Sequence, residues 1–580
     1  MTVEKLITDH IDIWSSALQT RSMAGRGSNG KIDLYGIKKL RELILELAVR
    51  GKLVPQDPND EPASELLKRI AAEKAELVKQ GKIKKLKPLP EISEDEKPFE
   101  LPEGWEFMRI DHVGHDWGQK SPVNDFTYID VGSINKELGT ISEPGVINPK
   151  DAPSRARKIV RRNTVLYSTV RPYLLNIAVV DEDYDPEPIA STAFAIIHPW
   201  KGISSTFIYH YLRSPVFVSY VESCQTGIAY PAINDKQFFT GVIAIPPAEE
   251  QLRIVSKVNE LMSLCDQLEQ QSLTSLEAHQ QLVETLLATL TDSQHAKELT
   301  ENWARISQHF DTLFITEASI DALKQTILQL AVMGKLVPQD PKDEPASELL
   351  KRIEQEKAQL VKEGKIKKQK PLPPINDDEK PFDLPQGWIF IRMNHAIDVR
   401  DGTHDSPKAV IGVEGYPLIT SKDFSNGSID FSNAKYISKE DHDAISRRSL
   451  VEVDDILFSM IGGNIGNQVK VSTDRQFSIK NLALFKYYTK EATNPDFVKL
   501  FTEYVANTLQ TKAIGGAQPF VSLGILRGLV FPLPPIKEQS RITLKSKTLF
   551  IMCDTLKSRL QSTQQTQLHL ADALTDSALS

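Results

Sequence analysis

The chain has 580 residues, with 69 Lys and Arg against 77 Asp and Glu, and its formal net charge is −8. An apolar content of 40% and a charged content of 25% are typical of globular domains, so disorder over the whole chain is excluded; the length suffices for about four domains. The acidic balance also excludes a generic polycationic nucleic-acid coat, so any contact with DNA has to be local.

Cysteine usage and hydropathy indicate the compartment. Three cysteines, Cys224, Cys265 and Cys553, are too few for a disulfide framework or a Cys-rich zinc site. The N-terminal sequence MTVEKLITDHIDIW has no apolar core of a signal peptide, and no run of about 18 apolar residues occurs anywhere. We therefore expect a cytoplasmic protein without a membrane segment.

The first predicted elements are helices over residues 37–49 and 63–79. They belong to a block whose sequence occurs twice in the chain. GKLVPQDPNDEPASELLKRI (51–70) recurs as GKLVPQDPKDEPASELLKRI (334–353), with 19 of 20 positions identical. The offset of 283 residues persists to LPEGW (101–105) and LPQGW (384–388), and it predicts matching helices near 320–332 and 346–362.

Two dissimilar segments, about 106–245 and 389–533, each follow a copy of this block. β-rich runs alternate with Gly, Pro and Asn in both; they lie at 164–170, 176–180 and 194–197, and at 455–461, 467–471 and 482–488. Residues 163–180 resemble 454–471, and 227–247 resemble 516–535. We interpret the two segments as one mixed α/β fold carrying different surface loops, where binding specificity usually resides.

A second repeated block follows each variable segment, IPPAEEQLRI (245–254) and LPPIKEQSRI (533–542), at an offset of 288 residues. Both open a long stretch with an apolar 4-3-4-3 spacing, which predicts helices of about 40 residues and about 60 Å. The seam residues are Ile254, Val258, Leu261, Cys265 and Leu268, then Leu282 and Leu286; the second copy has Ile542, Ser546, Leu549, Cys553, Leu556 and Leu560, then Leu570 and Leu574. We predict an antiparallel two-stranded coiled coil; two separate helices, each packed on its own domain, are the alternative.

The chain thus reads as constant, variable, constant, variable, constant, with boundaries at 1–105, 106–247, 248–388, 389–535 and 536–580. Uneven divergence within one chain indicates that the constant blocks meet the same partner twice and the variable ones meet different targets. Recent duplication with recombination is the simpler explanation, and it gives the same architecture. We predict an α+β fold with an internal pseudo-twofold repeat, typical of a two-armed adaptor.

Catalytic signatures are absent from the sequence. It contains no GxxxxGK[ST] phosphate loop, no HExxH and no paired Cys/His spacing for zinc. Residues 494–497 (NPDF) superficially resemble the loop of amino-methyltransferases, but the second proline is replaced and no Gly-rich cofactor turn accompanies them. We predict no catalytic residue, metal or cofactor on this chain.

Nearly identical helical blocks that alternate with divergent β-rich segments resemble the specificity subunits of Type I restriction–modification systems. The resemblance covers essentially the whole chain. It rests on the GKLVPQDP…EPASELLKRI repeat, found in one subfamily, on STVRPYLLNIA (168–178) and IKNLALFK (479–486), and on the [IL]PPxxEQxRI blocks that open the long helices.

This resemblance implies a non-catalytic subunit whose two target recognition domains each read one half of an asymmetric, bipartite double-stranded DNA sequence. The helical regions then serve as a spacer and dock two modification (methyltransferase) subunits. S-adenosylmethionine would lie on those subunits, which methylate adenine, while ATP and Mg²⁺ would serve the added restriction subunits, translocases with nuclease activity. A protein-binding scaffold without DNA readout, or a self-contained methyltransferase or nuclease, are the alternative classes.

Candidate DNA-binding residues are polar side chains beside strands, since Arg and Lys match guanine edges and Gln matches adenine. They are Gln119, Lys120, Arg171 and Tyr230 in the first domain, and Thr403, His404, Ser421, Lys422 and Gln518 in the second. Arg155, Arg157 and Lys158, within a run of five cations over 155–162, suit phosphate contacts. An ordinary surface role is the alternative for each.

Overall fold

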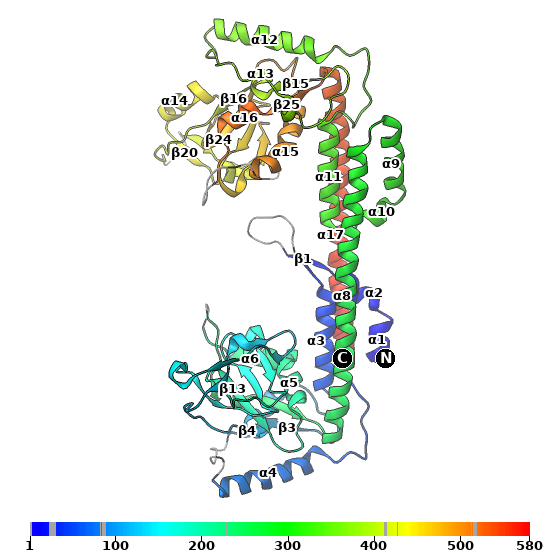
Figure 1. Cartoon of the computed structure of the whole chain (residues 1–580), viewed down its shortest axis with the longest axis vertical. Helices are drawn as coiled ribbons and strands as arrows, with labels where there is room; N and C mark the ends of the chain where they lie inside the picture. The colour runs from blue at the N-terminus through cyan, green and yellow to red at the C-terminus, as the bar shows by residue number, and fades with distance from the viewer. Residues whose placement is uncertain are drawn as a thin grey trace. The chain divides into compact units, whose positions relative to one another are not determined.

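The fold was analysed in a computed structural model that describes residues 3–21, 31–81, 83, 89–227, 230–410, 415–425, 427–511, 513 and 519–580. The chain forms two compact units (Figure 1). The first contains the described residues up to 274 together with 564–580, and the second contains residues 275–563. Because each unit combines a variable segment with several helices, the compact units cut across the five predicted segments.

Helices of the constant blocks form the support of each unit. In the first unit they are α1 (Val3–Thr8), α2 (Ile11–Ser16), α3 (Tyr35–Val49) and α4 (Ala63–Lys79), with a small ribbon of β1 (Gln19–Arg21) and β2 (Lys31–Asp33). The second unit has α9 (Ala296–Gln308), α10 (Phe310–Leu313), α11 (Glu317–Val332) and α12 (Ala346–Lys362). The helices predicted at 63–79 and 346–362 are confirmed at those bounds, and α3 and α11 begin within a few residues of the predicted starts.

Two long helices contribute to both units. Helix α8 spans Ala248–Asp292 and α17 spans Ile536–Leu579, as the apolar spacing predicts. The part of α8 up to residue 274 belongs to the first unit and the rest to the second, whereas α17 begins in the second unit and ends in the first. No loop therefore separates the units along these two helices.

The variable domain of the first unit is built from two four-stranded sheets and two two-stranded ones. Its strands are β3 (Glu106–Arg109), β4 (Gly114–His115), β5 (Phe126–Ile129), β6 (Ile134–Asn135), β7 (Thr140–Ile141), β8 (Gly145–Ile147), β9 (Ala156–Ile159), β10 (Val165–Ser168), β11 (Ile177–Val179), β12 (Pro188–Ser191), β13 (Phe194–Pro199) and β14 (Val242–Ile245). One four-stranded sheet has the order β11-β10-β13-β4 and another β8-β5-β12-β9, in which β5 and β12 are parallel; β6 and β7 form a further short hairpin. Helices α5 (Ser205–Arg213), α6 (Pro215–Cys224) and α7 (Asp235–Thr240) complete the domain.

The variable domain of the second unit has the corresponding strand order. Its elements are β15 (Ile389–Arg392), α13 (Met393–Ala396), β16 (Ile397–Asp401), β17 (Tyr416–Ile419), β18 (Phe424–Ser425), β19 (Ser428–Ile429), β20 (Lys435–Ile437), α14 (Lys439–Ser449), β21 (Ile456–Ser459), β22 (Gln468–Lys470), β23 (Ser478–Ile479), β24 (Leu482–Tyr487), α15 (Pro495–Thr511), α16 (Leu523–Gly528) and β25 (Val530–Leu533). The sheet β16-β24-β21-β22 matches β4-β13-β10-β11, and the parallel pair β17–β23 matches β5–β12. Both domains therefore share a mixed α/β core, and they differ in their connections.

Each variable domain begins and ends in one antiparallel ribbon. Strand β3 pairs with β14, so that Glu106 lies opposite Ile245, and β15 pairs with β25, so that Ile389 lies opposite Leu533. A buried arginine at the end of the first strand fixes each ribbon to the constant block. Arg109 donates to Glu96 at 2.7 and 2.9 Å, and Arg392 donates to Glu379 at the same distances.

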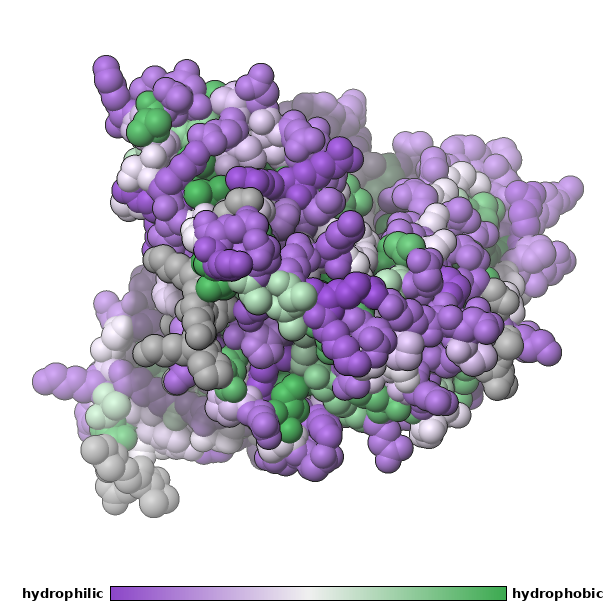
Figure 2. Space-filling view, turned by 90° about the horizontal axis from the view of Figure 1, so that it is seen from below, coloured by the Kyte–Doolittle hydropathy of each residue, from purple (hydrophilic) through white to green (hydrophobic). Residues whose placement is uncertain are grey.

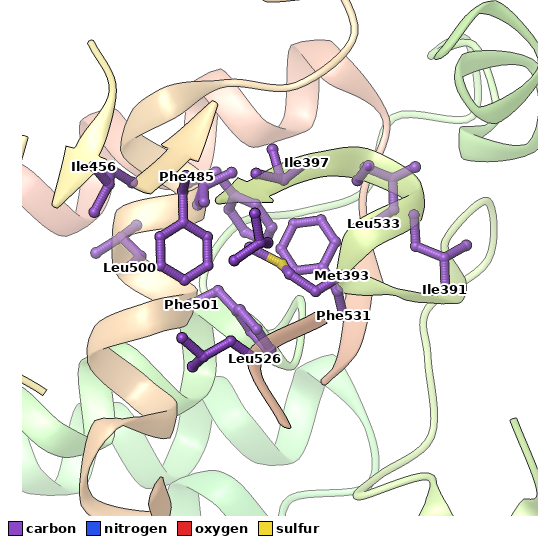
Figure 3. Packing of buried hydrophobic residues seen from close by; sticks show 14 of the residues in the cluster. Ile391, Met393, Ile397, Ile456, Phe485, Leu500, Phe501, Leu526, Phe531 and Leu533 are labelled. Carbon is purple, nitrogen blue, oxygen red and sulfur yellow. The ribbon is translucent and has the colours of Figure 1, made fainter. Parts of the chain in front are cut away.

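The core of the second variable domain shows how these elements pack (Figure 3). Met393 from α13 lies among the rings of Phe485, Phe501 and Phe531, which come from β24, α15 and β25. The rings of Phe501 and Phe531 meet edge to face, with centroids 4.9 Å apart. Burying each such side chain stabilises the domain by about 1.5–3 kcal/mol.

The apolar seam of the long helices is buried on α8 and in part only half-buried on α17, and it does not pack as one two-stranded coiled coil. Ile542 belongs to the core of the second variable domain, whereas Leu549, Cys553, Leu556 and Leu560 pack with residues of α8 and α11 in a separate cluster. A third helix therefore joins the seam in the second unit. Ile254, Val258, Leu261, Cys265 and Leu268 of α8 are likewise buried.

The predicted continuation of the seam is wrong by one residue. Leu282 and Leu570 are half exposed, whereas Val283 and Ala571 are buried, and Leu287 and Leu290 follow Val283. Val283 lies 18 residues after Cys265, and Ala571 lies 18 residues after Cys553, which is five turns of a straight α-helix. The buried face follows the period of 3.6 residues, and the predicted heptad period of 3.5 does not hold here.

Candidate nucleic-acid interface

The cationic run of the first variable domain is divided by the alternation of strand β9. Arg157 points to the surface, where it donates to Ser121 Oγ at 2.6 Å, and Arg155 at the start of the strand is exposed. Lys158 points inward, is only 5% exposed and lies 3.6 Å from Asp235. Because successive side chains of a strand point to opposite faces, one residue of the run is taken into the protein. Its burial argues against the predicted phosphate contact of Lys158, while Arg155 and Arg157 remain available.

Two residues that are predicted to contact DNA bases, Gln119 and Lys120, lie directly beside Arg157. The segment Gly118–Lys120 runs along β9, because Ile159 N donates to Gly118 O at 3.1 Å and Lys120 N donates to Arg157 O at 2.9 Å. Gln119 is exposed, and Lys120 forms an ion pair of 2.6 Å with the exposed carboxylate of Glu187. Surface pairs of this kind are weak, so a phosphate can compete for the lysine.

The other two residues of this domain that are predicted to contact bases, Arg171 and Tyr230, contact each other. The guanidinium of Arg171 lies over the ring of Tyr230, 4.9 Å from its centroid, although the residues are 59 positions apart in the chain. Arg171 N donates to Pro231 O at 2.8 Å, which fixes the backbone on which the pair is built. Tyr230 is 69% exposed, so this pair faces solvent.

An aromatic cluster beside Gln119 was missed in the sequence. The rings of His115, Trp117 and His198 lie within 4.5–5.4 Å of one another, and Arg161 stacks on Trp117 at 4.0 Å. Burial lowers the pKa of His115, and burial together with His115 and Arg161 lowers the pKa of His198 to about 4. Both imidazoles are therefore neutral near pH 7. The run His115-Asp116-Trp117 immediately before the predicted readers was the available signal.

In the second domain, the predicted residues occupy neighbouring segments. Thr403 forms a parallel bridge with Lys480, whose N–H donates to Ile419 O at 2.9 Å, so the segments at 403–404, 480–481 and 419–421 adjoin. Thr403 is only 5% exposed, and its hydroxyl accepts from Asp405 N at 3.1 Å. Its side chain thus holds a turn, which argues against a base contact.

His404 and Lys422 are exposed in the same region. His404 Nδ1 lies 3.1 Å from Asn481 Oδ1, and its Nε2 lies 3.3 Å from Asp401 Oδ2. Lys422 and Ser421 belong to a short turn of 3-10 helix after β17. Asn481, with φ +56°, was not predicted, and Gln518 lies outside the described residues.

The repeated residues around the long helices have a structural use. Gln56 and Gln339 donate to Glu250 and Glu538 at 2.8 and 3.1 Å, and Arg253 and Arg541 pair with Asp60 and Asp343. Gln251 is buried and accepts from Ser204 N at 2.8 Å, as Gln539 accepts from Asn494 N. Both copies therefore hold the loop at 51–63, or 334–346, and the variable domain against the first turns of a long helix.

Other residues of the repeat lie on the exposed faces of helices α4 and α12. Helix α4 buries only Ala63, Leu66 and Ile70, and α12 buries only Ala346, Leu349 and Ile353. Several identical residues on these helices point to solvent, namely Glu65, Lys68, Arg69, Glu73 and Lys79 with their copies Glu348, Lys351, Arg352, Glu356 and Lys362. Internal packing does not explain the identity of those residues.

Other kinds of site find little support in the part of the chain that the structure describes. Among those residues, no three or more His, Cys, Asp or Glu side chains are arranged to hold a metal ion, and no helix is long and apolar enough to cross a membrane. On the face shown in Figure 2, hydrophilic residues predominate and apolar residues lie in small groups.

A pair of variable domains with one fold and different exposed loops, on a repeated helical support, defines a two-domain recognition protein. Residues 102–278 match the family described as "Type I restriction modification DNA specificity domain". The chain is 49% identical to the "Type I restriction enzyme EcoAI specificity subunit" and 50% identical to the "Type I restriction enzyme EcoEI specificity subunit", both of Escherichia coli, and each alignment covers 100% of both chains.

The chain belongs to the specificity subunits of Type I restriction enzymes, which are the non-catalytic DNA-recognition subunits of these systems. Its fold is similar to that of a chain solved in "Structural basis underlying complex assembly and conformational transition of the type I R-M system". The TM-score is 0.52 at 22% identity, over 83% of this chain and 99% of the other.

Proposed function

We propose that each variable domain reads one half of an asymmetric, bipartite double-stranded DNA sequence. The observation that carries this proposal is that two domains of matching strand order present different loops, while the residues that attach them to the helices are repeated. In the first domain, Gln119, Lys120 and Arg157 adjoin on the surface, so one face combines groups for base edges with a group for phosphate.

The net charge is compatible with this role. The first variable domain, from 106 to 246, carries 13 Lys and Arg against 15 Asp and Glu, so it does not attract DNA by its total charge. Affinity for DNA increases with the number of phosphates that a protein neutralises. The exposed cations of this domain are therefore expected to hold the DNA phosphate backbone only when other subunits also enclose the duplex. We therefore infer that this subunit acts within a complex.

Two modification subunits are the proposed partners of the repeated surface. The identical exposed residues of α4 and α12 give the chain two equal docking faces, which suits one methyltransferase subunit for each half-site. Those subunits would bind S-adenosylmethionine and flip the target adenine, because a base within a duplex is out of reach of an active site. Restriction subunits, with ATP and Mg²⁺, would complete the endonuclease. A cytoplasmic location follows from this role as an expectation.

Helices α8 and α17 are proposed as the spacer between the half-sites. Each contributes to both units without an intervening loop, and the equal order of elements supports an internal twofold repeat. Half-sites that are read from one face of B-DNA lie about one turn, or 34 Å, apart, so a helical spacer would fix the length of the gap.

Exchange of one variable domain tests the proposal. Residues 106–247 are replaced by the corresponding domain of another specificity subunit, and DNA methylation is mapped in cells that also contain the modification subunits. We expect only one half of the methylated sequence to change; exchange of 389–535 should change only the other half. A change in both halves would contradict independent reading.

Two further measurements separate the alternative classes. Binding to DNA is measured with the modification subunits present, on duplexes of random and of methylated-motif sequence. Equal binding to every sequence would favour a protein scaffold without DNA readout. Binding of S-adenosylmethionine by the purified chain alone, or modification of DNA by it, would favour a self-contained enzyme.

A further inference from the structure

The two variable domains contain the same turn, filled with different residues. After β10, Val170 bridges Ala232, and Arg171 N donates to Pro231 O at 2.8 Å. After β21, Ile461 bridges Phe520, and Gly462 N donates to Pro519 O at 2.8 Å. Arg171 and Gly462 therefore occupy one position of a common turn.

This position requires a left-handed backbone. Arg171 has φ +50° and Gly462 has φ +72°, and four residues later the same holds for Leu175 at +53° and Gly466 at +95°. Glycine adopts such angles without strain, whereas an L-residue with a Cβ is strained there. The second domain uses the relaxed residue, while the first places an arginine against the preference of its own backbone. Strain of this kind marks positions where the side chain serves a function.

The side chain of Arg171 is supported by one ring, and the described part of the chain offers no acceptor to its donors. Tyr230 supports the guanidinium from one side, at 4.9 Å, and is itself 69% exposed. Among the described residues, no side chain or carbonyl accepts a hydrogen bond from this guanidinium, and no carboxylate pairs with it. By contrast, the guanidinium of Arg109 donates to Glu96 and to three backbone carbonyls. A rigid fork with unused donors matches the O6 and N7 acceptors of guanine in the major groove.

We propose that Arg171 reads a guanine in the half-site of the first variable domain and that Tyr230 is its positioning residue. This inference rests on the proposed function, since it assumes that the domain reads DNA. It assigns no such contact to the second domain, where Gly462 presents no side chain and, among the described residues other than its chain neighbours, no atom lies within 4 Å of the place of its Cβ.

The test uses the variants R171G and R171K in the full chain, assembled with its modification subunits. Binding is measured on duplexes in which each base pair of the recognised sequence is replaced in turn. R171G has the residue that the turn prefers, so it should unfold at the same temperature as the unaltered protein or higher. It should lose about 10- to 100-fold in discrimination at one G·C pair of the first half-site and nothing in the second. R171K should retain affinity and lose most of that discrimination, because an ammonium lacks the bidentate fork.

The matched control is R162A, which removes an equal charge from an exposed arginine of the same domain. Its effect should be the same for every duplex. If R171G keeps full discrimination at every base pair, or weakens all duplexes equally as R162A does, the assignment of Arg171 is wrong while the proposed function stands. If the unaltered complex shows no sequence dependence in this half-site, the proposed function itself fails.

Discussion

Gln251 is buried at the first turn of α8, and its replacement by alanine is expected to destabilise the first unit strongly. Its Oε1 accepts from Ser204 N at 2.8 Å, and its Nε2 donates to Pro246 O at 3.1 Å. The side chain is 1% exposed, so water does not replace it. A buried donor and a buried acceptor each lose about 2 kcal/mol when left unpaired, so Q251A should lower the free energy of unfolding by about 4 kcal/mol.

Thermal unfolding of the full chain measures this effect. For a unit of this size, about 4 kcal/mol corresponds to a fall of roughly 8–16 °C in the first transition. The control is Q270A, an exposed glutamine of the same helix and the same unit that donates to Thr274, for which less than about 0.5 kcal/mol is expected. If Q251A unfolds at the temperature of Q270A, the side chain of Gln251 does not hold the domain.

The variant Q251E adds a test of the hydrogen-bond direction. Its second carboxylate oxygen would face Pro246 O, and only the protonated acid can donate to that carbonyl. Its folded pKa should therefore lie above its unfolded pKa, and the loss of stability should be largest at pH 8 and diminish as the pH falls towards 5. A loss that does not depend on pH would contradict this geometry.

Three further predictions concern other buried groups. Burial lowers the pKa values of His198 and His210 to about 4, so each contributes stability that is present above pH 6.5 and is lost as the pH falls towards 4. The loss is at most about 1.4 kcal/mol per pH unit for the buried His210 and smaller for His198, whose charge solvent screens. Urea midpoints across this range should fall, and H210N should flatten the slope. Replacement of Arg392 by methionine removes the donor of Glu379 and of three carbonyls and should cost about 1.5–3 kcal/mol by urea unfolding, because these acceptors can turn to water; an unchanged midpoint would show that the ribbon does not depend on it. Burial raises the pKa of Cys265 to about 11, so its alkylation at pH 8 should be at least about 100-fold slower than in denatured chain, and equal rates would contradict its burial.

The periodic parts of the fold could be predicted from the sequence. Repeats and apolar spacing gave both short helices, at 63–79 and 346–362, and both long ones. The partners of those helices could not be predicted, because a buried stripe does not show what covers it. The packing of α11 with α8 and α17 in one cluster and the one-residue shift at Val283 depend on tertiary packing.

The individual residues of the candidate site could be predicted from the sequence, but their contacts in space could not. Composition and turn positions singled out Arg171 and Tyr230, but their contact depends on the pairing of Val170 with Ala232 across the domain. The charge run at 155–162 gave no sign that Lys158 would point inward, since that follows from the start of β9 at Ala156. Polarity locates surface loops, whereas strand register decides which side chains reach the surface.

The ribbons β3–β14 and β15–β25 have a consequence for the gene. Since each variable domain starts and finishes at adjacent strands, the length of sequence between them does not alter the helices, and the two variable segments can differ in size. Arg109 and Arg392 donate to corresponding glutamates of the two constant blocks, Glu96 and Glu379, so a segment moved from one position to the other meets an equivalent contact. A crossover within the near-identical coding blocks would thus join a new variable domain to a support that already has the contacts to hold it.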